Sequence, residues 1–312
     1  MTPSSTSLPV AIIVAVGPAE TEVERLRDLA DSIAHHDPGP ATLVLVDDAP
    51  QPRQLASQLT LPPRIQAVSL HHPRHGAKVT FTRGKGICSA VLQALQWIQK
   101  NTETQFILKL DTDSLVISNF RDRLSTLLGA DQSLGMVGAH TLTPNGTRRD
   151  WSHHKPIIRE LAGGFNWRMP IRSLREHSNP AHRHIATLIG AALANSYDPG
   201  EHCMGGGYAL SRELLDRMAR AGHLEDPTLW MSVDLPEDVM IGIHVRAAGL
   251  GFANNVMEGE VFGVRYLGLP DSPERLLARR YSIIHSVKND ERFDERSVRA
   301  FFKQHRESAA RD

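Results

Sequence analysis

Short apolar runs alternate with amphipathic stretches along the first part of the chain. Residues 10–16 and 42–46 are almost entirely apolar and rich in β-branched side chains, and residues 64–70 form a third such run. Runs of this kind are typical of strands buried on both faces. Residues 20–34 carry apolar side chains at helical spacing. The alternation predicts an α/β fold with a mostly parallel sheet flanked by helices, in which ligands bind beyond the carboxyl ends of the strands.

The same alternation continues downstream. Residues 84–100 have one apolar face and predict a helix, and the apolar run at 106–110 predicts the next strand. Residues 211–221 predict a helix with a serine N-cap and a glycine directly after its end. A further helix is expected over residues 234–249.

The remaining segments lack this regularity. Residues 140–200 are rich in Gly, Pro, His and Arg without strong periodicity, and we expect a mobile insertion there. Residues 1–8 predict a flexible leader, and the charged residues 291–312 predict a tail or a terminal helix. Residues 9–290 are then expected to form a single domain.

The charge and cysteine content exclude some classes of protein. Lys plus Arg equals Asp plus Glu at 35 each, so no overall field favours nucleic acid or an anionic membrane. The two cysteines, Cys88 and Cys203, lie far apart and outside any CxxC motif, which suits a reducing compartment. No apolar stretch reaches the ~20 residues of a membrane-spanning helix. We therefore expect a cytoplasmic protein without a transmembrane segment.

The 16 histidines include several close groups without the paired spacing of a zinc site. We expect these grouped histidines to lie on the surface or in loops: His71, His72, His153, His154, His182 and His184.

The segment FILKLDTDSLVI places Asp111 and Asp113 directly after an apolar strand. Side chains two residues apart in an extended segment point the same way, so both carboxylates can face one ligand. Hard oxygen ligands suit Mg²⁺ or Mn²⁺, which proteins usually bind through one or two carboxylates together with substrate phosphates. An ordinary turn is the alternative, because turns also favour aspartate. The strand-end position favours a metal site.

Two other positions are candidates for binding a nucleotide. Asp47 and Asp48 end the second predicted strand and can hydrogen-bond a base or a ribose, or they form a solvated turn. Lys85 lies between two glycines at the start of a helix, where backbone N–H groups and a cation both favour phosphate. The RGKG sequence lacks the spacing of a P-loop, so a flexible helix start is the alternative.

Two further segments combine glycines and acids. Gly205, Gly206 and Gly207 in HCMGGGYALS allow close approach of the backbone to a ligand, or they form a bulge without function. Glu237 and Asp238 in LPEDVMIGIHVRAAGL fall in the first turn of the predicted helix, where the helix dipole favours acids. Asp234 and Glu237 also fit a capping box, which leaves Asp238 as the acid without a structural role.

Four segments together carry a family resemblance: GKGICSAVLQALQWIQK, FILKLDTDSLVI, CMGGGYALS and PEDVMIGIHVRAAG. Their order and approximate spacing resemble the β1,3-galactosyltransferase, Fringe and core-1 galactosyltransferase superfamily, over roughly residues 84–130 and 200–250. The resemblance implies a GT-A fold, a Rossmann-like fold that binds nucleotide sugars. Residues 9–118 would form its nucleotide-sugar-binding half, and residues 119–290 its acceptor-side half.

The resemblance also implies an activity, which is inverting transfer of a hexose from a nucleotide diphosphate sugar. The expected donor is a UDP-sugar, and the acceptor is a hydroxyl of a glycan, a lipid-linked saccharide, a protein or a small molecule. By position, Asp111 and Asp113 would bind Mn²⁺ or Mg²⁺ and the diphosphate, Gly205 to Gly207 and Glu237 would line the donor site, and Asp238 would be the general base. His285 in YSIIHSVK is the candidate third metal ligand, with a buried structural histidine as the alternative.

The chain departs from these relatives in two respects. They often have three consecutive acids where this chain has Thr112 between two aspartates. Most eukaryotic relatives are anchored luminal proteins with disulfides, so a bacterial cytoplasmic enzyme is expected here. Two alternatives stay open. A nucleotidyltransferase acting on sugar phosphates usually has a glycine-rich and basic loop after its first strand, where this chain has Glu20, Glu22 and Glu24. An inactive carbohydrate-binding protein would not need the acids.

Overall fold

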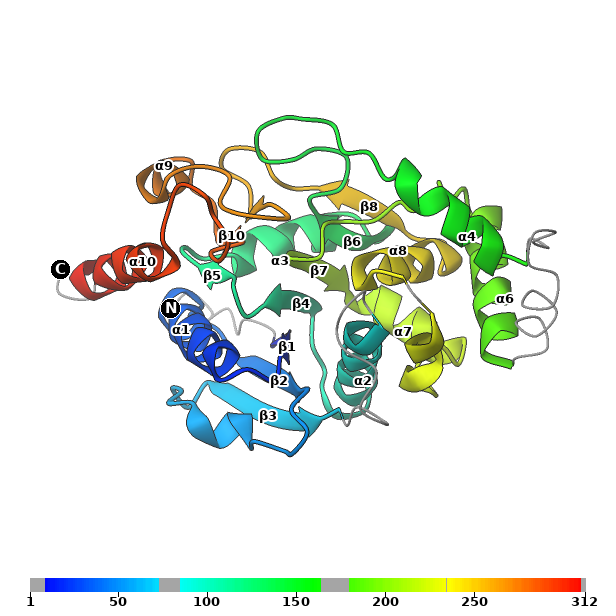
Figure 1. Ribbon diagram of the computed structural model, residues 1–312, viewed down its shortest axis with the longest axis horizontal. Helices are drawn as coiled ribbons and strands as arrows, with labels where there is room; N and C mark the ends of the chain where they lie inside the picture. Colours follow the sequence, from blue (N-terminus) through cyan, green and yellow to red (C-terminus); the bar gives the residue numbers. More distant parts are fainter. Residues whose placement is uncertain (1–8, 73–84, 164–179, 234, 310–312) are drawn as a thin grey trace, which may run out of the picture.

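The computed structural model describes residues 9–72, 85–163, 180–233 and 235–309. Its central feature is a seven-stranded sheet in the order β3-β2-β1-β4-β7-β6-β8 (Figure 1). The strands are β1 (Val10–Val16), β2 (Ala41–Asp47), β3 (Ile65–His71), β4 (Phe106–Asp111), β6 (Leu134–Gly138), β7 (Gly207–Ser211) and β8 (Gly251–Asn254). Of these seven strands only β7 runs antiparallel to its neighbours, so the expected mostly parallel α/β sheet is confirmed.

A second, smaller sheet lies beside the first. It has the order β5-β10-β9, formed by β5 (Leu115–Val116), β10 (Ile283–His285) and β9 (Phe262–Val264). Because β5 follows β4 almost directly, the chain passes from the large sheet into the small one just after Asp111. This junction brings a C-terminal strand close to the end of β4.

Helices cover both faces of the large sheet. Successive side chains along a strand point to opposite faces, and here both faces carry apolar side chains that need covering. Val10, Ile12 and Val14 of β1 pack toward α1 (Glu20–His36) and α3 (Arg121–Ala130), whereas Ala11 and Ile13 face the other side. The other side is covered by α2 (Lys85–Asn101), α7 (Arg212–Arg220) and α8 (Glu237–Ala247), with α6 (Pro180–Ala194) packed against α8. The remaining helices of the described residues are α4 (Lys155–Leu161), α9 (Pro273–Ala278) and α10 (Glu295–Ala309), and short 3₁₀ turns lie at Leu55–Gln58, Ser152–His154 and Pro227–Ser232.

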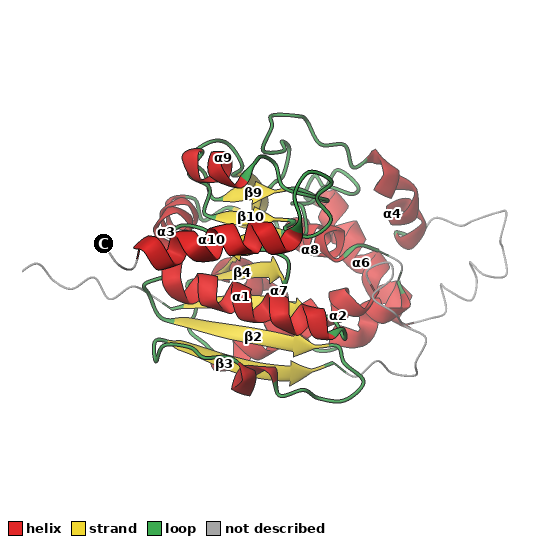
Figure 2. Cartoon of the chain, turned by 60° about the vertical axis from the view of Figure 1, so that its left-hand side comes forward, coloured by secondary structure: helices red, strands yellow, loops and turns green. Residues whose placement is uncertain are grey.

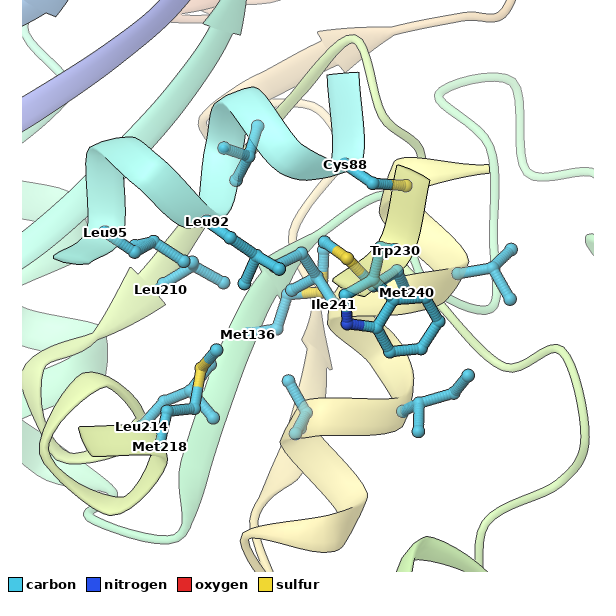
Figure 3. Packing of buried hydrophobic residues seen from close by; sticks show 14 of the residues in the cluster. Cys88, Leu92, Leu95, Met136, Leu210, Leu214, Met218, Trp230, Met240 and Ile241 are labelled. Carbon is cyan, nitrogen blue, oxygen red and sulfur yellow. The ribbon is translucent and has the colours of Figure 1, made fainter. Parts of the chain in front are cut away.

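The apolar core on the α2 side joins segments that are distant in sequence (Figure 3). Leu92 and Leu95 of α2 share it with Leu210 of β7 and with Trp230, which is 2% exposed. This core holds α8 against the sheet. The first turn of α8 is thereby fixed near the start of β7, and it carries the acidic pair predicted from the sequence.

The strands and helices expected before residue 111 are present within one or two residues of their predicted bounds. The helix after Ser211 is also confirmed, since the Ser211 hydroxyl accepts from the backbone N–H of Leu214 and Gly222 follows the helix with φ of +75°. The predicted capping box is wrong. The N-cap of α8 is Pro236, without a side-chain cap bond, and the Asp234 position lies outside the described residues.

The stretch without clear periodicity contains a helix, and one of the grouped histidines is buried. Residues 180–194, within the stretch that lacked clear periodicity, form α6, and its Ile185, Leu188 and Ile189 are buried in the core. The mobility of residues 140–200 stays a prediction, and residues 164–179 lie outside the described part. His72 lies in the loop after β3, as expected, but it is only 5% exposed and its ring is hydrogen-bonded to Ser89. Among the described residues, no helix is both long and apolar enough to cross a membrane.

Candidate metal and carboxylate site

Asp111, Asp113 and His285 converge where the two sheets meet. Asp111 ends β4, Asp113 follows in the turn to β5, and His285 ends β10. One ligand atom from each of the three lies within 4.8 Å of the others. His285 Nε2 is 3.5 Å from Asp111 Oδ2 and 3.3 Å from Asp113 Oδ1. The fold therefore brings together the three residues that the sequence suggested as metal ligands.

The ring of His285 is oriented for binding a cation. Its Nδ1 lies 2.7 Å from the carbonyl oxygen of Arg265, which can only accept, so Nδ1 carries a proton. Nε2 therefore offers its lone pair on the side of the carboxylates, as in many histidine metal ligands. Burial lowers the pKa of His285, but Asp113 and Asp111 outweigh it and raise the pKa above its usual value. Beside these two carboxylates, Nε2 of His285 favours binding a positive charge, which can be a proton or a metal ion.

One oxygen of Asp113 is held by Ser286 and Lys288, and the other faces His285. Its Oδ2 accepts from the Ser286 hydroxyl and lies 3.5 Å from the Lys288 ammonium. Burial raises the pKa of Asp113, but His285 and Lys288 lower it well below its usual range. Its Oδ1 is buried and has no hydrogen-bond partner among the described residues. His285 Nε2, at 3.3 Å, is its nearest polar neighbour, and a divalent cation bound between the two would satisfy this oxygen.

A buried lysine connects the proposed metal ligands, which we call the metal cluster (Asp111, Asp113 and His285), to α8. Lys109 of β4 is 1% exposed, and its Nζ lies 2.6 Å from Asp111 Oδ1, 2.6 Å from the Gly205 carbonyl oxygen and 3.4 Å from Glu237 Oε2. Tyr208 lies opposite Lys109 across the β4–β7 ladder and donates its hydroxyl to Glu237. Lys109 therefore fixes the orientation of the Asp111 carboxylate. A lysine inside an apolar strand was the sequence signal for this contact, although no role was predicted for it.

Glu237 belongs to this buried group rather than to a helix cap. Burial is the main cause that raises its pKa, and Asp238 adds to it, while Lys109 opposes it; the resulting pKa is about 7. Its carboxylate points at Tyr208 and Lys109. The sequence-based assignment of Glu237 to a capping box is therefore wrong.

The segment from Gly205 to Gly207, which we call the glycine turn, separates Asp238 from the metal cluster. A Cβ added to Gly205 would lie 3.1 Å from Asp238 Oδ2, and a Cβ added to Gly206 would collide with the ring of His285. The Asp238 side chain is 17% exposed, and its Oδ2 is 3.5 Å from His202 Nε2. Glycine at these two positions is what allows the candidate base and the candidate metal ligand to approach the same stretch of backbone.

The candidate nucleotide contacts are placed differently. Asp47 is buried, and its Oδ1 accepts from the guanidinium of Arg53 at 2.6 Å and from the backbone of Ala49 at 3.0 Å. Its carboxylate therefore orders the loop after β2. Asp48, next to it, is 2% exposed. Lys85 begins α2 as expected, but its side chain lies outside the described residues.

Comparisons with known proteins support the fold. The chain matches no protein-family model and no curated protein sequence. Among solved structures it is similar to the WbbM bifunctional glycosyltransferase in its apo form, with a TM-score of 0.50 and 12% sequence identity. The match covers 95% of this chain and 49% of that one, so the chain spans about half the length of the solved protein. At this identity the likeness concerns the fold alone, and the chain has a Rossmann-like fold of the kind found in that glycosyltransferase.

Proposed function

We propose that the protein is a metal-dependent, inverting glycosyltransferase that moves a hexose from a UDP-sugar to an acceptor hydroxyl. The observation that carries this proposal is the Asp111, Asp113 and His285 cluster, which faces the glycine turn opposite Asp238. The likeness to a solved glycosyltransferase supports it at the level of the fold. The resemblance to the β1,3-galactosyltransferase and Fringe superfamily stays a prediction.

The donor set of this cluster fits Mn²⁺ or Mg²⁺. Two carboxylates and one imidazole supply hard or borderline ligands, and the unpartnered Oδ1 of Asp113 points at the same space as His285 Nε2. A cation held by Asp111, Asp113 and His285 would neutralise negative charge on a departing diphosphate. Lys109 and Ser286 hold the two carboxylates in place for this task.

Asp238 is the proposed general base. The acceptor hydroxyl passes its proton to Asp238 while its oxygen bonds to the anomeric carbon of the sugar. The bond from that carbon to the diphosphate breaks on the opposite face, so the anomeric configuration inverts. Gly205, Gly206 and Gly207 let the backbone approach the donor sugar, and Glu237 supports that wall through Lys109. Asp48, on the loop that Asp47 orders, and Lys85, at the start of α2, are proposed contacts to the nucleotide.

Substitution of the base tests this mechanism. Asp238→Asn keeps the volume of the side chain but cannot accept a proton, so turnover should fall by about 10²–10⁴-fold. Binding of UDP with Mn²⁺ and the melting temperature should change little. The matched control is Asp216→Asn, which removes a partly exposed carboxylate paired with Arg212 on α7 and should leave turnover unchanged. A fully active Asp238→Asn protein, or a product that keeps the donor's anomeric configuration, would overturn the mechanism.

A further inference from the structure

The C-terminal helix α10 packs on both segments that carry proposed metal ligands. It lies alongside α1 in the fold (Figure 2). An apolar cluster joins α10 to the residues around the ligands: Val298, Phe302, Leu115, Ile284 and Val287. Leu115 follows Asp113 by two positions, and Ile284 immediately precedes His285. The helix therefore shares an apolar cluster with residues that flank the proposed ligands on both segments.

Thr112, between the two carboxylates, is tied to the same helices. It is 3% exposed, and its hydroxyl donates to Oε2 of Glu22 on α1. Its carbonyl oxygen accepts from the guanidinium of Arg299 on α10 at 3.4 Å. Thr112 therefore faces α1 and α10. Its side chain is hydrogen-bonded to α1, and its backbone is hydrogen-bonded to α10.

Charged side chains close these contacts into a ring. Arg25 contacts Glu22 at 2.6 Å and binds both oxygens of Glu295 at 2.6 and 2.7 Å. Glu295 also accepts from Arg299 at 2.9 Å. Thr112, Glu22, Arg25, Glu295 and Arg299 thus contact one another in sequence and return to Thr112; we call this the Thr112 ring. Its two acids balance its two arginines, so it adds no net charge beside the ligands.

We propose that α10 contributes to cation binding by supporting the segment from Asp111 to Asp113. Through this support, the Thr112 ring sets the affinity of the site for the cation. The ring residues are positioning residues and do not touch the cation. Partners that orient metal ligands without touching the metal typically change its affinity by about 10–100-fold when they are removed. This inference rests on the metal site of the proposed function.

The first test changes only the hydroxyl of Thr112. Thr112→Val keeps the shape of the side chain but cannot donate to Glu22, whereas Thr112→Ser keeps the donor. Mn²⁺ is titrated into each protein by calorimetry without any nucleotide, and the melting temperature is measured in chelator. The valine variant should bind Mn²⁺ about 10–100-fold more weakly, and the serine variant should bind within a few-fold of the unchanged protein.

The second test compares two arginines of α10. Arg299 and Arg306 both pair with Asp28 on α1, at 2.8 and 2.6 Å, but only Arg299 reaches Thr112. Arg299→Met should weaken Mn²⁺ binding by about 10-fold. Arg306→Met, which also loosens α10 from α1, should leave the affinity unchanged even where its melting temperature falls.

The outcomes separate the two proposals. Equal Mn²⁺ affinity in the valine, serine and unchanged proteins would overturn the role of the ring. An equal loss in both arginine variants would also overturn it, because the effect would then follow stability alone. If the unchanged protein itself bound no Mn²⁺, the metal site of the proposed function would fall, and the inference would fall with it.

Discussion

Glu237→Gln should remove a pH dependence of stability that the buried carboxylate imposes. The group has a pKa of about 7 in the folded protein against 4.5 when exposed, and burial is the main cause. Below its unfolded pKa the side chain is neutral in both states and costs nothing. As the pH rises toward the folded pKa, the unfolded chain ionises first, so unfolding becomes easier.

The size of the effect follows from the same pKa values. Each pKa unit of difference between the folded and unfolded states corresponds to about 1.4 kcal/mol. Raising the pH from below 4.5 to above about 7 therefore lowers the free energy of unfolding by about 3 kcal/mol through Glu237 alone. Between about pH 5 and about pH 8 most of this change, about 2–3 kcal/mol, should be visible. The glutamine side chain of the variant has no charge to lose or gain.

Urea unfolding of both proteins across this pH range measures the effect. Chelator is present throughout, so that metal binding does not add its own pH dependence. A constant offset between the two proteins is allowed, because the amide bonds Tyr208 and Lys109 differently. The difference in unfolding free energy must shift with pH in favour of the variant. Parallel curves over the whole range would show that folding does not raise the pKa of Glu237, and would refute the reasoning.

Two further predictions concern neighbours of Glu237 in the same network. Gly206→Ala should abolish Mn²⁺ binding measured by calorimetry, because the added methyl would collide with the ring of His285; unchanged affinity would show that the ring can move aside. Lys109→Met should lower the free energy of unfolding by about 3–5 kcal/mol, since it leaves Asp111 and Glu237 without their buried counter-charge. Chemical denaturation at neutral pH measures the free energy of unfolding. A loss under about 1 kcal/mol would mean that Lys109 and Glu237 do not form a buried pair.

Much of the fold was predictable because local patterns decide it. The apolar runs of β1, β2 and β4 are long enough to be recognised as buried strands, and Asp111 follows directly where β4 ends. The three consecutive glycines were recognisable in the sequence, although the sequence did not show why glycine is needed there. Gly205 and Gly206 are needed because Asp238 and the ring of His285 occupy the space that a Cβ would take, and this depends on chain segments far apart in sequence.

The polar contacts behind the site could not be predicted from local patterns. Lys109 and Tyr208 become neighbours only through the register of β4 with β7, and Glu237 meets them only because α8 packs on that face. The capping pattern at Glu237 was a plausible local explanation that the tertiary contact replaced. The role of α10 depends likewise on its packing beside α1, so its charged sequence gave no sign of the contact between Arg299 and Thr112.

Binding of UDP with and without a divalent cation tests the proposed metal site most directly. UDP is titrated calorimetrically into the protein in excess Mn²⁺ and, separately, in chelator. Binding should be readily measured with Mn²⁺ and strongly weakened in chelator, and Asp113→Asn should weaken the Mn²⁺-dependent binding to a similar degree. Equal affinity for UDP in Mn²⁺ and in chelator would contradict a metal site formed by Asp111, Asp113 and His285.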